Sequence, residues 1–346
     1  MLSQLWKCSY RAQMMLSRQI STATKETKIG IIGCGNVGNA VANNLLRKGF
    51  NVTSSFDTSK EHMEKMPQGI KHCGSPREVA ETCEVIITGL PRPVNVLEAA
   101  EGQDGILAGL SKDKVWVDHS TTDNDNTVKF VEEAKTKGAY VLEAPITGGL
   151  AALKKGNMVA FMAGDKQAAD AVMPIMECSY QRSVYCGAVG SAMMMKVVSN
   201  LLAAVNLLAL SEVLMLAKRA NLDLKLFYEA IRVSAGHSFV WDTGVPFVLQ
   251  GSYEPGFTME LFCKDMQLGY DMARKYRVPM PIHQHTMAAF RQCQYQYGDD
   301  AACYIPPKAL QEALGVELQD QRFKDWDYDT EIIKDILIVK NKGIKD

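Results

Sequence analysis

The chain has 346 residues, of which 47% are hydrophobic and 22% are charged. This length suits two domains rather than one ordinary core, and the composition is that of a globular protein rather than a disordered or collagen-like one. The 38 Lys and Arg residues nearly balance the 39 Asp and Glu residues, which gives a formal net charge of -1. Such a balance gives no general attraction to phosphate backbones, so nucleic acid is not an expected partner.

The N-terminal segment, residues 1–27, has the composition of a mitochondrial presequence. Its cationic residues are Lys7, Arg11, Arg18 and Lys25, and no acidic residue precedes Glu26. Charges interrupt its longest apolar run, which does not favour a secretory signal. A disordered tail that is basic by chance is the alternative. We therefore expect the mitochondrial matrix as the location, with the cytoplasm as the alternative.

The cysteines and histidines indicate a reducing compartment and no metal site. The nine cysteines are scattered, odd in number and without a C-x-x-C pair, which argues against a disulfide framework. The six histidines are equally dispersed. The pair His283 and His285 has no neighbouring cysteine or carboxylate at a spacing that zinc sites use, so no metal is expected.

Residues 28–190 predict a Rossmann domain, a doubly wound and mostly parallel sheet. Short β-branched runs alternate there with helical stretches, which is the pattern of parallel strands joined by crossover helices. The expected strands are Lys28–Ile32, Asn51–Phe56, Glu84–Leu90, Lys114–Asp118, Ala139–Glu143, Met158–Ala163 and Arg182–Cys186.

Residues 191–318 predict an all-helical domain that begins with a long apolar helix from about Ser191 to Arg219. Between Lys196 and Glu212 lie 15 uncharged residues, fewer than the roughly 20 that span a bilayer, so we expect a buried interdomain helix and no membrane partner. Further helices are expected over residues 224–233, 257–276, 282–297 and 308–314. Residues 319–346 are expected to form a charged C-terminal extension with an amphipathic stretch over residues 331–340.

The first expected strand runs directly into a G-x-G-x-x-G motif, which predicts a dinucleotide site. Its residues are Gly33, Gly35, Asn36, Val37 and Gly38, with Cys34 between the first two glycines. The first glycine permits a tight turn, the second lets the backbone approach a pyrophosphate, and the third lets the helix pack against the sheet. The alternative is a glycine-rich structural turn without a ligand.

Asp57 ends the second expected strand, about where a dinucleotide fold places an acid for the adenosine ribose. Its charge would repel a 2′-phosphate, so NAD is the expected cofactor and NADP the less favoured one. Ser54 and Ser55 lie nearby and leave phosphate possible, and a surface aspartate without a ligand is the alternative reading.

Lys196 lies early on the long apolar helix, one turn before Asn200, so the two side chains project from one face. Burial against apolar walls and a cationic nicotinamide would lower the pKa of such a lysine toward the range of a general base. The alternative is a lysine whose ammonium group reaches solvent at the helix end.

Four separated segments resemble the β-hydroxyacid dehydrogenases, the family that includes 3-hydroxyisobutyrate dehydrogenase and is related to 6-phosphogluconate dehydrogenase. They are Asp118-His-Ser-Thr-Thr122, Glu143-Ala-Pro-Ile-Thr-Gly-Gly149, Gly187-Ala-Val-Gly190 leading to Lys196 and Asn200, and Lys264-Asp265. The resemblance covers nearly all of residues 28–318. It implies hydride transfer between a small hydroxyacid and a nicotinamide cofactor, and, for 3-hydroxyisobutyrate, a place in valine catabolism.

The resemblance also implies roles for particular residues. Lys196 and Asn200 would be catalytic, and Ser120, Gly148 and Gly149 would hold a substrate carboxylate. Thr121, Leu90, Pro91, Asn95 and Lys264 would lie beside the cofactor, whereas His119 has no family role and is expected to be structural. From the residues alone, Ser120 also fits a helix cap, and Gly148-Gly149 also fits a plain loop.

We therefore expect an NAD-dependent dehydrogenase of a 3-hydroxyisobutyrate-like acid with Lys196 as general acid and base, assembled as a homodimer or homotetramer. A reductase of tartronate or succinate semialdehyde is the first alternative, and a dinucleotide-binding scaffold without catalysis is the second. The chain departs from the family pattern at Glu143, Thr147, Met193 and Ser199, and at the stretch from Ser234 to His237. These departures concern the substrate pocket more than the reaction.

Overall fold

A computed structural model describes residues 20–122, 124–333 and 336–345. Most of the proposed presequence, residues 1–19, lies outside the described residues. Ala23, near its end, is buried, and its amide donates to the carbonyl of Ala171 at 2.7 Å.

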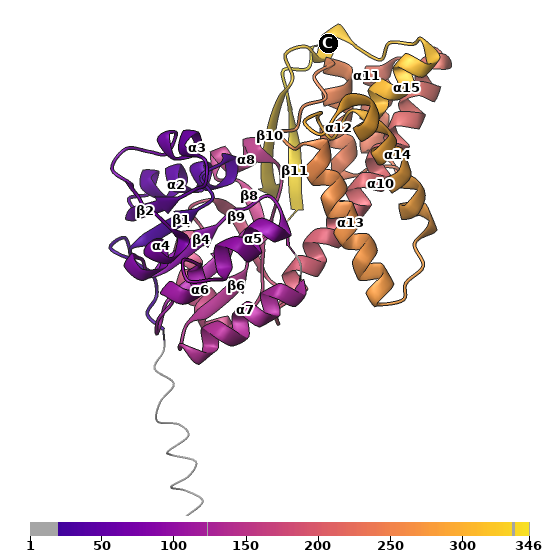
Figure 1. Ribbon diagram of the computed structural model, residues 1–346. Coiled ribbons are helices and arrows are strands. Elements are labelled where there is room, and N and C mark those ends of the chain that lie inside the picture. Colours follow the sequence, from indigo (N-terminus) through magenta and orange to yellow (C-terminus); the bar gives the residue numbers. More distant parts are fainter. Residues whose placement is uncertain (1–19, 123, 334–335, 346) are drawn as a thin grey trace, which may run out of the picture.

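The first half of the chain forms a six-stranded parallel sheet in the order β3-β2-β1-β4-β5-β6 (Figure 1). The strands are β1 Ile29–Ile32, β2 Val52–Phe56, β3 Lys71–His72, β4 Val85–Thr88, β5 Val115–Asp118 and β6 Tyr140–Glu143. Helices join them: α2 Asn36–Arg47, α3 Lys60–Glu64, α4 Pro76–Thr82, α5 Pro93–Ala100, α6 Ile106–Gly109 and α7 Asn124–Thr136. The strand order reverses between β1 and β4, and ligands of doubly wound sheets bind at the carboxyl ends of strands beside such a reversal.

A second sheet of three strands follows, in the order β7-β8-β9. It contains β7 Ile146–Thr147, β8 Met158–Met162 and β9 Tyr180–Tyr185, with α8 Leu150–Lys155 and α9 Lys166–Met176 between them. The sequence predicted the last two strands as part of one Rossmann sheet, whereas they pair only within this smaller sheet, apart from a bridge between Glu143 and Ala163. The strands β3 and β7 were not predicted, because two residues carry no alternation to detect.

The second half contains α10 Ser191–Arg219, α11 Leu224–Arg232, α12 Phe239–Gln250, α13 Met259–Lys275, α14 Pro281–Tyr297 and α15 Pro306–Leu314. The doubly wound domain followed by a helical domain is therefore confirmed. The sequence did not predict α12, because Gly244 and Pro246 inside it are residues that usually interrupt helices. A Cβ atom on Gly244 would lie 3.1 Å from the side chain of Leu210, so a glycine there allows α12 to pack closely on α10.

Among the described helices, α10 alone has the length and apolar composition that a membrane span requires. It runs through the helical domain and contacts α11, α12, α13, α14 and α15. Its buried residues include Val197, Ala204, Leu207 and Leu214. The central helix of a folded domain has the same length and composition, and α10 holds that place here.

The C-terminal residues, expected as a charged extension with an amphipathic stretch and no assigned structure, form a hairpin. A short 3-10 helix, Gln321–Phe323, precedes the antiparallel strands β10 Asp327–Ile333 and β11 Ile336–Lys342. Figure 1 shows this hairpin in yellow between the two halves, where β10 contacts α8 and β11 contacts α12. In β10 the acidic residues Asp327 and Asp329 alternate with Tyr328, which packs on Phe247 of α12.

Candidate active site

The glycine motif after β1 forms the turn that a dinucleotide requires. Gly33 has a φ of +89°, a conformation that L side chains rarely adopt. A Cβ atom on Gly38 would lie 1.9 Å from the Gly33 carbonyl oxygen, so only glycine allows α2 to start so close to the turn. A Cβ atom on Gly35 would meet nothing within 4 Å, which leaves its face open to a ligand. Asn36 and Val37 form the first turn of α2, whose amides point toward that space.

Asp57 is fixed beside this turn by two backbone amides. Its Oδ2 atom accepts a hydrogen bond from the Cys34 amide at 2.7 Å, and its Oδ1 atom accepts one from the Ser59 amide at 2.8 Å. The Oδ2 atom also lies 3.5 Å from the His62 Nδ1 atom, whereas Oδ1 retains a lone pair for a further donor such as a ribose hydroxyl. The residues of the turn and Asp57 therefore fit the adenosine and pyrophosphate parts of a nicotinamide dinucleotide.

The loops after β4 and β5 meet beside the same strand ends. The Leu90 amide donates to the Ser120 hydroxyl oxygen at 2.9 Å, so this hydroxyl links two loops. Pro91 follows Leu90 in the loop that leads to α5, where the side-chain oxygen of Asn95 is buried without a hydrogen-bond partner. An unsatisfied buried acceptor is costly, and a donor on a bound cofactor would satisfy it.

Lys196 is buried in α10, with 9% of its surface exposed. Its ammonium group donates to the Asn200 side-chain oxygen at 3.0 Å, and the Asn200 amide donates to Asp265 at 2.6 Å. Burial lowers the pKa of Lys196, while nearby Asp265 opposes that shift and Lys264 adds to it. The lysine therefore does not extend to solvent, and its neutral form is more accessible than that of a lysine in water.

Lys264, on α13, connects this cluster to the sheet domain. Its ammonium group donates to the Thr121 carbonyl at 2.8 Å and lies 3.0 Å from Asp265. A continuous set of contacts thus joins Lys196, through Asn200 and Asp265, to the loop after β5. Sequence reasoning assigned Asp265 no role of its own; its place beside the predicted Lys264 was the only signal.

Gly148 and Gly149 form the turn between β7 and α8, with φ angles of 126° and 86°. The Gly148 carbonyl accepts a hydrogen bond from the Tyr328 hydroxyl at 2.6 Å. Among the described residues, no hydrogen bond connects this turn directly to Lys196 or Asn200. The hydrogen bonds of this turn are to Tyr328 of the C-terminal hairpin and to the Leu153 amide of α8.

His119, next to Ser120, is buried, and both of its ring nitrogens are hydrogen-bonded. Its Nδ1 atom is 2.7 Å from the Ala144 carbonyl, and its Nε2 atom is 2.9 Å from the Tyr180 hydroxyl. Burial lowers its pKa to about 4, so the ring is neutral, donates to the carbonyl and accepts from the phenol. These contacts give His119 a structural role.

The described residues contain no group of three or more His, Cys, Asp or Glu side chains that is arranged for a metal ion.

Glu143, at the end of β6, ties the sheet to the start of α10. Its Oε2 atom accepts from the Gly190 amide at 2.9 Å, whereas Oε1 is buried without a hydrogen-bond partner. Burial raises the pKa of this carboxyl from 4.5 to about 7.

The protonated form of Glu143 is thus favoured by folding. Its contribution to stability is complete below pH 4.5 and is lost as the pH rises through about 7. Glutamine stays neutral at every pH, so Glu143→Gln does not lose this stability. We therefore expect the difference in free energy of unfolding between Glu143→Gln and the unmodified protein to shift by about 2–4 kcal/mol in favour of the variant between pH 4.5 and 8. Urea unfolding at several pH values measures this. Parallel curves for the two proteins would contradict the raised pKa.

Comparison with known proteins agrees with this geometry. A model of the NAD-binding domain of 6-phosphogluconate dehydrogenase matches residues 28–187, and a model of the NAD-binding region of NADP-dependent 3-hydroxyisobutyrate dehydrogenase matches residues 190–304. The mitochondrial 3-hydroxyisobutyrate dehydrogenase of Mus musculus is 34% identical over 75% of this chain and 79% of its own length. The chain belongs to the β-hydroxyacid dehydrogenase family.

One further relative and one solved structure are also similar to this chain. Glyoxylate/succinic semialdehyde reductase 1 of Arabidopsis thaliana is 28% identical over 77% of this chain and 92% of its own length. The solved structure of 3-hydroxyisobutyrate dehydrogenase from Mycobacterium tuberculosis with L-serine has a TM-score of 0.75 and covers 83% of this chain and 99% of its own, at 23% identity. The chain is accordingly an NAD(P)-dependent dehydrogenase that acts on the CH-OH group of a small hydroxyacid. Its cofactor is a nicotinamide dinucleotide.

Proposed function

We propose that the chain oxidises a small β-hydroxyacid such as 3-hydroxyisobutyrate to its semialdehyde, reversibly and with NAD, and that Lys196 is the general acid and base. The observation that carries the proposal is the burial of Lys196 within hydrogen-bonding distance of Asn200, in a cluster that reaches the loop after β5. A lysine held this way can exist as the free amine at moderate pH.

Bound NAD would supply the acceptor for the hydride that leaves the carbinol carbon. Neutral Lys196 accepts the hydroxyl proton of the substrate as the C–H bond breaks, and the carbonyl product forms. Asn200 holds the Nζ atom in place, and Asp265 orients Asn200 by accepting its amide. In the reverse direction the protonated Lys196 returns its proton to the new alkoxide.

Ser120, Gly148 and Gly149 would hold the substrate carboxylate. The support is that Ser120 lies where the loops after β4 and β5 meet, because its hydroxyl oxygen accepts from the Leu90 amide. The two glycines carry no side chain that would block an approach to their amides, a common way to bind an anion.

A related semialdehyde reductase is the second candidate function. The Arabidopsis thaliana relative is named for glyoxylate and succinic semialdehyde, and tartronate semialdehyde is a substrate of the same chemical class. The stretch Ser234-Ala-Gly-His237 departs from the pattern of 3-hydroxyisobutyrate dehydrogenases, which favours keeping this candidate. A scaffold without catalysis is disfavoured, because Lys196, Asn200 and Lys264 are all present.

A substrate panel tests the proposal. The purified protein is given NAD and a series of hydroxyacids, namely 3-hydroxyisobutyrate, 3-hydroxypropionate, 4-hydroxybutyrate and glycerate, and NADH is followed by absorbance. The largest kcat/KM is expected for 3-hydroxyisobutyrate. A preference for 4-hydroxybutyrate or glycerate would favour the semialdehyde reductase, and no turnover with any member would refute both.

We further propose that the protein works in the mitochondrial matrix. The support is the basic composition of residues 1–27 and the mitochondrial naming of the relative from Mus musculus. Cleavage at least one residue upstream of Ala23 would keep its peptide amide and so its contact with Ala171. A 3-hydroxyisobutyrate substrate would then place the reaction in valine catabolism. N-terminal sequencing of the protein from isolated mitochondria tests the location, and an intact Met1 in the cytosol would refute it.

A homo-oligomer is also proposed, assembled through α10. One face of this helix exposes Met195, Val198, Leu202, Val213 and Leu216, although the opposite face is buried in the core. Exposed apolar side chains that share one face of a helix are typical of an interface between proteins. Analytical ultracentrifugation is expected to give a dimer or tetramer, and a monomer at micromolar concentration would refute the proposal. Neither nucleic acid nor membrane is proposed as a partner.

A further inference from the structure

The C-terminal hairpin is fixed to the helical domain by an aromatic cluster. Trp326 and Tyr328 both pack against Phe247 of α12, with ring centroids 5.0 Å and 6.4 Å from its own. The Gln250 amide adds hydrogen bonds to the carbonyls of Lys324 and Trp326, at 3.0 Å and 3.2 Å. The start of β10 therefore has a defined position on α12.

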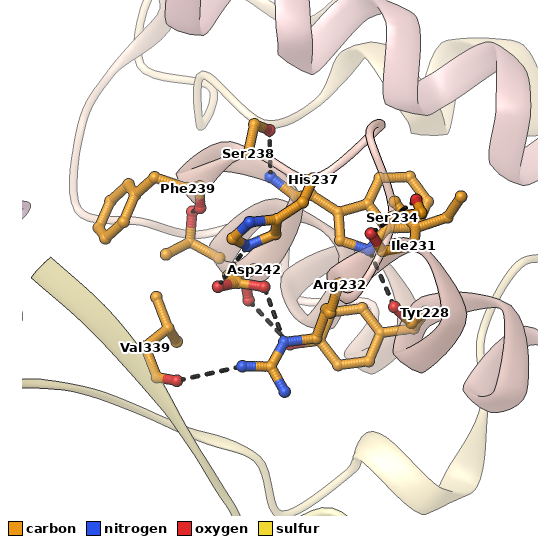
Figure 2. Close-up of polar contacts among 11 residues, drawn as sticks. Tyr228, Ile231, Arg232, Ser234, His237, Ser238, Phe239, Asp242 and Val339 are labelled. Carbon is orange, nitrogen blue, oxygen red and sulfur yellow. Dashed lines mark hydrogen bonds and ion pairs between the residues drawn. The ribbon is translucent and has the colours of Figure 1, made fainter. Parts of the chain in front are cut away.

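The second strand of the hairpin has a polar anchor of its own, shown in Figure 2. Buried Asp242 accepts from the Arg232 guanidinium at 2.8 Å and lies 3.0 Å from the His237 ring. Another nitrogen of Arg232 donates to the Val339 carbonyl in β11, at 3.5 Å. One buried carboxylate thus holds the arginine that contacts the hairpin, and it also contacts His237, which belongs to the stretch where the chain departs from the family pattern.

On its other side the hairpin reaches the sheet domain at the glycine turn. The Tyr328 hydroxyl donates to the Gly148 carbonyl at 2.6 Å, and the Lys155 ammonium group donates to the Tyr328 carbonyl at 3.2 Å. Lys155 also pairs with Asp329 at 3.6 Å. Burial raises the pKa of Tyr328, so its phenol stays protonated and available as a donor.

The contact at Gly148 has a geometric consequence for Gly149. In a trans peptide the carbonyl of one residue and the amide of the next point in opposite directions. Two consecutive glycines let the intervening peptide rotate more freely than any other pair would. A donor that holds the Gly148 carbonyl therefore also fixes the direction of the Gly149 N–H group.

We propose that Tyr328 is a positioning residue for the substrate carboxylate. Its phenol holds the Gly148-Gly149 peptide in the orientation that turns the Gly149 amide away from the hairpin and toward the substrate. The second family match ends at residue 304, so this contribution comes from a part of the chain beyond it. The inference rests on the proposed function, in which Gly148 and Gly149 bind a carboxylate.

The test is Tyr328→Phe, which removes the hydroxyl and keeps the ring that packs on Phe247. With saturating NAD, the KM for 3-hydroxyisobutyrate is expected to rise about 3–10-fold, the effect of one lost hydrogen bond, with a smaller change in kcat. The methyl ester of the same acid carries no carboxylate charge, so its kcat/KM is expected to stay within about twofold. Tyr185→Phe is the matched control, because the Tyr185 hydroxyl donates to the Gly164 carbonyl at 2.9 Å in the same domain.

The outcomes separate this inference from the proposed function. If the unmodified protein turns over 3-hydroxyisobutyrate and Tyr328→Phe has the same KM, the positioning role is refuted and the proposed function stands. Equal losses with acid and ester, or a loss of NAD binding together with a lower Tm, would show that the bond is merely structural and would also refute the role. No turnover by the unmodified protein would refute the proposed function and this inference with it.

Discussion

Replacing Lys196 with methionine is expected to lower kcat for hydroxyacid oxidation by about 10²–10⁴-fold, the range that a positioned general base contributes. Methionine has nearly the same length and fills the same buried space, but it accepts no proton. Removing a buried amine also removes a group that burial disfavours, so the Tm is not expected to fall by more than a few degrees. Steady-state NADH formation and thermal unfolding measure the two effects.

Lys114→Met is the matched control for this change. Lys114 is also partly buried, burial lowers its pKa, and its ammonium group donates to the carbonyls of Ala80 and Glu81. It lies at the start of β5, at the opposite end of the strand from Ser120. Its replacement is expected to leave kcat within about twofold. A Lys196→Met protein as active as this control would show that another group moves the proton.

Replacing Asp57 with alanine is expected to raise the KM for NAD about 10–100-fold, because hydrogen bonds to a charged carboxylate contribute about 1.5–3 kcal/mol each. Loss of the negative charge removes the repulsion of a 2′-phosphate, so the KM for NADP is expected to stay the same or fall. The ratio of kcat/KM for NAD to that for NADP therefore decreases. Initial rates with each cofactor at saturating hydroxyacid measure it.

A nearby carboxylate provides the control for Asp57. Glu61, on α3, is exposed and pairs with Lys65 at 2.6 Å. Glu61→Ala lowers the local negative charge by the same amount without touching the amides of Cys34 and Ser59. It is expected to leave the cofactor ratio unchanged. An equal shift in both variants would mean that general charge, rather than the position of Asp57, sets the preference.

The parts of the fold that the sequence predicts are those with local signals. A strand, three glycines and an acid about 20 residues further on describe one βαβ unit, so the turn at Gly33 and the place of Asp57 follow from a short stretch of chain. The face shared by Lys196 and Asn200 likewise follows from helical periodicity. Both expectations depend on residues that are close in sequence.

The remaining features depend on contacts between distant residues. Tyr328 and Gly148 are 180 positions apart, and no pattern around either one indicates the other. Asn200 and Asp265 are 65 positions apart, so the carboxylate that orients the asparagine becomes visible only when α10 and α13 pack together. The helix α12 forms despite Gly244 and Pro246, because tertiary packing can outweigh weak local propensity.

The pH dependence of kcat/KM in the two reaction directions tests the role of Lys196 most directly. Oxidation needs the neutral amine and reduction needs the ammonium ion, and burial lowers the pKa that separates them. The rate of oxidation is therefore expected to rise with pH and to level off below 10.5, the ordinary value for lysine, while the rate of reduction falls. Profiles that are flat, or that slope in the same sense in both directions, would contradict proton transfer by Lys196.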